Sequence, residues 1–93
     1  MRDSTETAVR LSVVYLARLR EAFGTRRETL ALAHESPTVD DVVQHLCTRG
    51  APWAAELAPG RAVRFAVNHR LAQRGDAVRD GDEVAIFPPV TGG

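Results

Sequence analysis

Residues 38–50, TVDDVVQHLCTRG, carry the clearest helix signal in this sequence and decide its fold. Thr38, followed three residues later by Asp41, resembles a capping box, in which two side chains satisfy backbone N–H groups at a helix start. The apolar side chains that follow recur at helical spacing and form one continuous stripe: Val39, Val42, Val43, Leu46 and Cys47. Gly50 is a typical helix stop. The pattern predicts one main amphipathic helix that needs a partner layer for its stripe.

The segments before this helix are typical of two strands joined by a short helix. Residues 9–16, VRLSVVYL, are rich in β-branched and aromatic side chains. Both faces of this strand are apolar toward its end, which suggests a central strand covered on each side. Residues 17–23 have apolar side chains at helical spacing and end before Gly24, and residues 26–33, RRETLALA, alternate as a second strand.

The segments after the main helix predict two further strands. Residues 63–69 alternate between apolar and polar side chains, and residues 83–87, EVAIF, form the last strand. One helical turn fits near Trp53–Leu57, and Asp80-Gly81-Asp82 marks a turn. The order β-α-β-α-(turn)-β-β favours an α+β fold of the β-grasp type, a mixed sheet packed on one main helix, although other α+β layouts share this pattern. The domain organisation expected is a disordered extension at 1–8, a β-grasp domain at 9–87 and an extended tail at 88–93.

Composition restricts the possible functions. The chain has 93 residues, which allow one domain, and its 12 basic and 12 acidic side chains cancel, which argues against charge-driven binding to nucleic acid or membrane. Every basic residue is Arg, so a phosphate-binding loop that needs Lys and a Schiff-base lysine are excluded. The single cysteine, Cys47, cannot form an internal disulfide and is interpreted as a small buried hydrophobe.

Targeting and metal signals are missing from the sequence as well. The N-terminal MRDSTETAV lacks a signal-peptide core, and no apolar run approaches 18 residues, so the cytoplasm is the expected location. The three histidines, His34, His45 and His69, show no metal-ligand spacing, and no metal site is predicted.

The C-terminal stretch FPPVTGG, residues 87–93, carries the functional signal. Pro88 and Pro89 cannot continue a sheet ladder and favour an extended exit from the last strand. Gly92 and Gly93 have no Cβ and can pass through a narrow channel. The six residues after Phe87 can reach about 20 Å. A carboxylate on such an arm can enter the active site of another protein, but it must be activated there because it has no leaving group.

The segment VNHRLAQRGDAVRDGDEVAIFPPVTGG, together with VVYLARLREAFGT and the TVDDVVQHL helix, resembles the MoaD/ThiS family of ubiquitin-like sulfur carriers, and within it the small subunit of molybdopterin synthase. The resemblance covers about residues 10–93. It implies that a partner adenylyltransferase, similar to ubiquitin-activating enzymes, uses ATP and magnesium to adenylate Gly93. A persulfide donor then supplies sulfur, so that Gly93 becomes a thiocarboxylate.

The resemblance also implies partners and site residues. The large subunit of molybdopterin synthase would accept the tail into its active site, in a heterotetramer. Val90 and Thr91 would lie in the entry channel of that subunit, and Gly92, which has no side chain, would leave room for the chain to pass. Two carriers would supply the sulfurs that convert cyclic pyranopterin monophosphate into molybdopterin. The residues matching the family's apolar contact positions, on the sheet face opposite the main helix, are Leu16, Leu71 and Phe87. Arg20 and Arg70 are candidates for rim contacts. The chain itself would bind no cofactor and would not be a catalyst alone.

Two alternatives remain open on the sequence. The chain fits a sulfur carrier for another pathway, such as thiamin or amino-acid biosynthesis, whose tail enters a different acceptor. It also fits a ubiquitin-like protein modifier whose Gly93 forms isopeptide bonds with lysines of other proteins, because both chemistries begin with the same adenylate.

Overall fold

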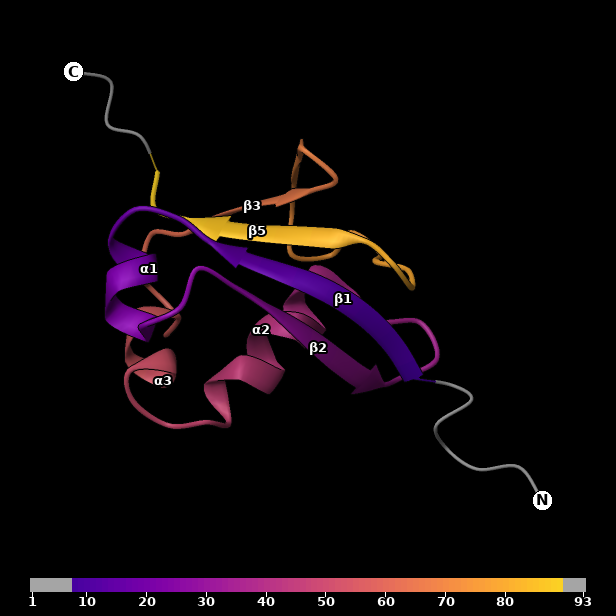
Figure 1. Cartoon of the computed structure of the whole chain (residues 1–93), viewed down its shortest axis with the longest axis horizontal. Coiled ribbons are helices and arrows are strands. Elements are labelled where there is room, and N and C mark those ends of the chain that lie inside the picture. Colours follow the sequence, from indigo (N-terminus) through magenta and orange to yellow (C-terminus); the bar gives the residue numbers. More distant parts are fainter. Residues whose placement is uncertain (1–7, 90–93) are drawn as a thin grey trace.

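The computed structural model describes residues 8–89, which form one mixed sheet with three helices (Figure 1). The strand order across the sheet is β2-β1-β5-β3-β4. The elements along the chain are β1 (Ala8–Tyr15), α1 (Arg18–Phe23), β2 (Arg27–Ala33), α2 (Val39–Cys47), α3 (Trp53–Glu56), β3 (Arg64–Val67), β4 (Arg70–Ala72) and β5 (Glu83–Phe87). Residues 1–7 of the predicted extension 1–8 and residues 90–93 of the predicted tail 88–93 lie outside the described residues.

The topology confirms the predicted β-grasp fold. β1 pairs parallel with β5, while β1–β2, β3–β5 and β3–β4 are antiparallel. The helices lie on one side of this sheet (Figure 1). α2 starts with the predicted capping box: Thr38 Oγ1 accepts a hydrogen bond from Asp41 N at 3.3 Å, and Thr38 N donates to Asp41 Oδ2 at 2.8 Å. The second bond favours the carboxylate and holds the pKa of Asp41 below its usual range.

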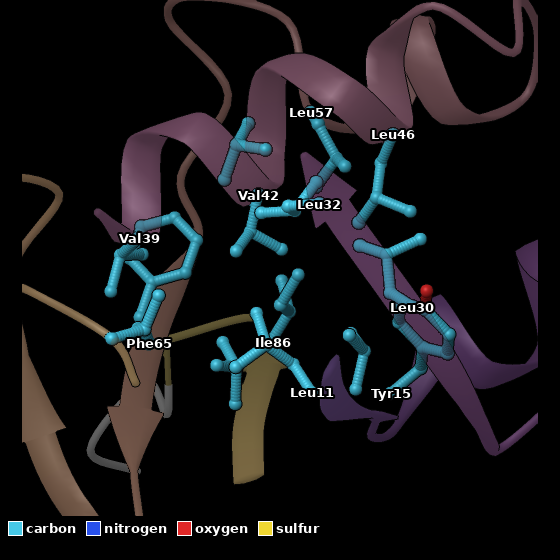
Figure 2. Close-up of a cluster of buried hydrophobic side chains, with 14 of the residues drawn as sticks. Leu11, Tyr15, Leu30, Leu32, Val39, Val42, Leu46, Leu57, Phe65 and Ile86 are labelled. Carbon is cyan, nitrogen blue, oxygen red and sulfur yellow. The ribbon is translucent and has the colours of Figure 1, made fainter. Parts of the chain in front are cut away.

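The apolar stripe of α2 packs against the inner face of the sheet, as predicted (Figure 2). Every second residue of the strands faces this core, which places Leu11, Val13 and Tyr15 of β1 in it. Leu57, which follows α3, is buried in the same hydrophobic core and covers it from the helix side. Burial of such side chains contributes about 1.5–3 kcal/mol each and holds the helix on the sheet. The buried members from the other elements are Leu19, Leu30, Leu32, Val39, Val42, Val43, Leu46, Phe65, Val78, Val84 and Ile86.

Two expectations about the strands are wrong. Three strands follow the main helix where the sequence predicts two, because Arg70–Ala72 pairs with β3 as β4 in register Phe65↔Ala72. The expectation that β1 is covered on both faces also fails within residues 8–89, because the helices lie on one side only and Val14 faces away from the core. The first strand is moreover shifted by one residue, so that Leu16 follows β1.

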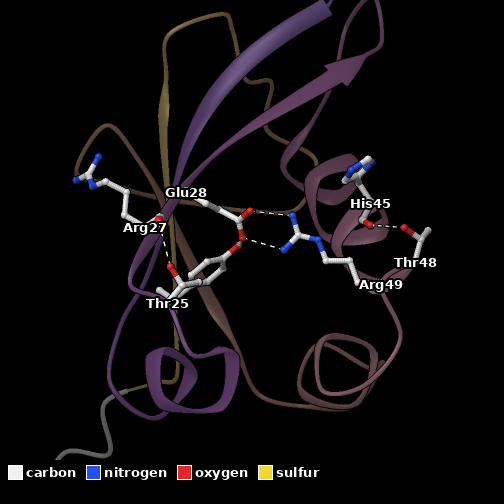
Figure 3. Close-up of polar contacts among 7 residues, drawn as sticks. Thr25, Arg27, Glu28, His45, Thr48 and Arg49 are labelled. Carbon is white, nitrogen blue, oxygen red and sulfur yellow. Dashed lines mark hydrogen bonds and ion pairs between the residues drawn. The ribbon is translucent and has the colours of Figure 1, made fainter.

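A polar cluster joins the start of β2 to the end of α2 (Figure 3). Arg49 donates two hydrogen bonds to the Glu28 carboxylate, at 2.9 and 2.8 Å, and the Tyr15 hydroxyl donates a third at 2.6 Å. These bonds, that of Arg49 first, hold the pKa of Glu28 below its usual range. Burial, followed by the bond to Glu28, raises the pKa of Tyr15. The Arg49 guanidinium also lies 4.5 Å from the Trp53 ring centroid, so the cluster ties the helices to the sheet.

We expect Glu28→Gln to lower the free energy of unfolding at pH 7 by about 1–2 kcal/mol, because it removes a charge-assisted bidentate pair. Since the pKa of Glu28 is lower in the folded chain, its contribution is complete above the unfolded pKa of about 4.3 and is lost as the pH falls further. The difference between wild type and variant should therefore be constant from about pH 7 to about pH 5 and shrink below about pH 4. Urea unfolding at several pH values measures it.

The matched control is Glu21→Gln, since Glu21 is exposed on α1 and makes no ion pair within residues 8–89. A Glu28→Gln effect that persists unchanged at pH 3, or that equals the control, would contradict the role given to the Arg49–Glu28 pair.

Candidate functional site

The carboxyl end of β5 is fixed next to β1 and α1, where the chain leaves the sheet (Figure 1). Tyr15 pairs with Ile86, and Leu16 N donates to Ile86 O at 3.2 Å. Ala17 then turns the chain into α1 with φ 56°, a conformation that favours glycine and costs a residue with a Cβ about 1–3 kcal/mol. The sharp turn keeps Leu16 beside the end of β5.

The sheet face opposite the helices carries a row of apolar side chains across four strands. The register Val14↔Ala85, Ala66↔Ala85 and Ala66↔Leu71 sets these four residues side by side. Their neighbours along the strands, such as Tyr15, Phe65 and Ile86, point into the core, so the row faces outward. Phe87 and Leu16 extend it toward the end of β5. We define the open-face patch as Val14, Leu16, Ala66, Leu71, Ala85 and Phe87.

The patch is accessible. Leu71 and Leu16 are the exposed large apolar side chains of the described residues, at 76% and 43%, and Phe87 is half-buried. A contiguous apolar surface of this kind marks an interaction site more often than a single exposed leucine does. The side chain of Phe87 has Arg64 as its cross-strand neighbour. Arg20, Arg64 and Arg70 are exposed and form no ion pair with an acidic side chain of residues 8–89.

The turn between β3 and β4 fixes Leu71 on the patch. Asn68 and His69 both have positive φ, 52° and 71°, as a two-residue hairpin turn of type I′ requires. The Asn68 amide donates to Asp82 Oδ1 at 2.9 Å and accepts from Glu83 N at 3.0 Å, while Asn68 N donates to Glu83 O at 2.8 Å. These bonds join the hairpin to β5.

The structure places the predicted site residues as follows. Leu16, Leu71 and Phe87 come together on the open-face patch, and Pro88 and Pro89 continue from β5, half-buried. Val90, Thr91, Gly92 and Gly93 lie outside the described residues. Sequence reasoning did not assign Val14, Ala66 and Ala85 to the contact surface. Their outward parity was readable from alternation, but only the strand register shows that they form one row.

Neither a metal centre nor a membrane-spanning helix is found among residues 8–89. Residues 8–89 contain no group of three or more His, Cys, Asp and Glu side chains able to hold a metal ion. No helix in this part of the chain is long and apolar enough to span a membrane. Cys47 is half-buried and lines a hollow of about 620 Å³ on the helix side, where Arg74 already pairs with Asp40 at 2.9 Å.

A mixed five-stranded sheet over one main helix, with its last strand ending beside an exposed apolar patch, defines a β-grasp protein of the ubiquitin-like class. The family model described as the ThiS family matches residues 13–93. The molybdopterin synthase sulfur carrier subunit of Escherichia coli is 40% identical over 83 residues, which are 89% of this chain and 99% of that protein. The chain therefore belongs to the ThiS family.

Solved structures agree with the β-grasp fold. The crystal structure of SAMP1 from Haloferax volcanii, described in a second crystal structure as small archaeal modifier protein 1, superposes with a TM-score of 0.74 at 28% identity, over 90% of this chain and 99% of that one. A chain in the complex of subunits 1 and 2 of the molybdopterin-converting factor from Helicobacter pylori has the same fold, with a TM-score of 0.58 at 20% identity over 91% of this chain and 100% of that one.

Proposed function

We propose that this chain is the sulfur carrier subunit of a molybdopterin synthase and that its reactive group is the carboxylate of Gly93. The observation that carries the proposal is the 40% identity to the Escherichia coli carrier subunit over nearly the whole of both chains. The sequence FPPVTGG at residues 87–93 and the exposed patch beside the end of β5 support it. The body of the domain then serves as a handle by which partner enzymes hold the tail.

The chemistry requires three steps at the carboxyl group of Gly93: adenylation, sulfur transfer and reduction. A carboxylate oxygen of Gly93 attacks the α-phosphorus of ATP, bound with magnesium by the activating partner, and pyrophosphate leaves. The terminal sulfur of a persulfide then attacks the acyl carbon and displaces AMP. A thiol reduces the resulting S–S bond, which leaves a thiocarboxylate on Gly93 and a disulfide on the donor side. The thiocarboxylate sulfur is a strong nucleophile, and the tail delivers it to cyclic pyranopterin monophosphate in the large subunit.

The partners in this proposal are the large synthase subunit, the adenylyltransferase and the persulfide donor. The name of the Escherichia coli relative describes it as one subunit of a synthase, and the Helicobacter pylori structure contains subunits 1 and 2 together. For this chain the open-face patch is the surface that suits such a subunit, because it is apolar, exposed and next to the origin of the tail. The proposal includes a cytoplasmic location, where ATP and reduced thiols are available.

The identity of the acceptor enzyme is tested by adding the thiocarboxylated carrier and cyclic pyranopterin monophosphate to the large subunit of molybdopterin synthase. The dithiolene product is expected, with return of the carrier to its carboxylate form. Sulfur release to a thiamin or cysteine precursor enzyme instead, with no dithiolene, would show that the chain serves a different pathway.

A second candidate function is protein modification, which the likeness to the modifier protein SAMP1 favours. Both functions begin with the acyl-adenylate of Gly93 and differ in the group that attacks it. Isopeptide-linked conjugates to lysines of other proteins, detected after expression with the activating enzyme, would establish this second use.

A further inference from the structure

The outer edge of β2 is a second surface that the proposed function does not use. β2 is the terminal strand of the sheet (Figure 1), and at seven residues it is longer than the three-residue β4 at the opposite edge. It contributes no side chain to the open-face patch. An edge of this length is usually protected by charge, proline or a bulge. The last five residues of β2, Thr29–Ala33, contain neither charge nor proline.

The register determines which backbone groups of β2 face this edge. Tyr15 N donates to Arg26 O at 3.0 Å, and the β1–β2 pairing continues from Val14↔Arg27 to Ala8↔Ala33. Hydrogen-bonded pairs alternate along an antiparallel ladder, so the backbone groups of residues 28, 30 and 32 face β1. Those of Thr29, Ala31 and Ala33 therefore face away from the sheet.

This edge is complementary to itself. If two β2 strands pair antiparallel about Ala31, Thr29 lies opposite Ala33 and Leu30 lies opposite Leu32, so that small side chains meet on the outer face and leucines on the core side. The same register brings Arg27, whose guanidinium also pairs with Glu83 at 3.2 Å in the same chain, close to Glu35, which follows the strand. Opposite charges therefore meet at both ends of the pair, and no like charges do.

The surface beside β2 fits the same arrangement. A groove of about 520 Å³ runs between β2 and α2 and is lined by Leu32, Ala33, Gln44 and His45. A two-fold axis perpendicular to the sheet at Ala31 puts both α2 helices on the same side, so the two grooves adjoin.

We propose that this chain forms a reversible two-fold dimer through antiparallel pairing of its β2 edges, centred on Ala31. The interface is one strand pair with its flanking helix surface, which is smaller than the ~1,600 Å² of a standard stable complex. We therefore expect a dissociation constant on the order of 10⁻⁴ M. The open-face patch stays accessible in both copies, since it lies on other strands.

Sedimentation equilibrium from about 10 µM to about 1 mM brackets that constant and tests the dimer. The average mass should rise from the 10.1 kDa of one chain toward twice that value. Ala31→Pro removes an edge N–H without touching the β1 ladder and should weaken association at least tenfold. Its matched control, Ala31→Val, keeps the N–H and should associate like wild type, with circular dichroism confirming that both variants fold.

A charge exchange tests the register independently of proline. Glu35→Arg should weaken the dimer severalfold by placing two arginines together, and Arg27→Glu combined with Glu35→Arg should restore it. A wild-type mass of 10.1 kDa at 1 mM would overturn the proposal, as would a monomeric chain that instead binds an extended peptide along β2. Equal association of Ala31→Pro and Ala31→Val, or no recovery in the double variant, would overturn the antiparallel pairing about Ala31.

Discussion

Removal of Gly93 is expected to abolish sulfur transfer while leaving the folded domain intact. The carboxylate would then stop about 3.3 Å short of the position that the activating enzyme acts on, and misplacement by even 1 Å costs about 10²-fold in rate. A serine added after Gly93 should abolish transfer equally, because the new terminal carboxylate follows a residue with a side chain. Both variants are assayed by adenylate formation with the activating enzyme and by sulfur transfer to the acceptor.

The control for these tail variants is the free energy of unfolding, measured with urea. It should match that of wild type, because the buried core seen in residues 8–89 runs from Leu11 to Ile86 and terminal residues contribute little to stability. A chain that unfolds when Gly93 is removed, or that transfers sulfur normally with the added serine, would contradict the proposal that the free end is the reactive group.

The second large effect is expected at the open-face patch. Leu71→Asp should weaken binding to the large subunit about 30-fold or more, because it places a charge in the middle of an apolar interface. Leu71 is 76% exposed in the free chain, so the change should barely alter folding stability. Phe87→Ala should weaken binding as well. Calorimetric titration with the large subunit and with the activating enzyme measures both effects.

The matched control is Ala55→Asp, which adds the same charge on α3, on the helix side of the molecule. It should bind like wild type. Equal affinities of Leu71→Asp and Ala55→Asp would show that the partners use a different surface.

Most of the fold was predictable because its signals are local. The α2 stripe, its capping box and the alternation in β2 and β5 each lie within a few residues of sequence, and each is observed. β4 escaped prediction for a physical reason. The two-residue turn before it uses Asn68 and His69 at positive φ, whereas the usual hairpin signal has glycine at the second position.

The candidate site was predictable in part. Leu16, Leu71 and Phe87 were selected by resemblance to a family, and the structure brings them to one face. Their continuity through Ala66 and Ala85 depends on strand register, which a sequence does not specify by alternation alone. The apolar outer side of Val14 predicts, by alternation alone, a second covering layer. An interaction surface produces the same pattern, since it is covered only when a partner binds.

The reactive group itself is best tested by the intact mass of the chain after incubation with the activating enzyme, ATP, magnesium and a persulfide donor. We expect a gain of about 16 Da, the difference between a sulfur and an oxygen atom, located at Gly93 by fragmentation and lost again on discharge to the acceptor. An unchanged mass under conditions where the acceptor nevertheless receives sulfur, or a gain located at Cys47, would contradict a thiocarboxylate carrier.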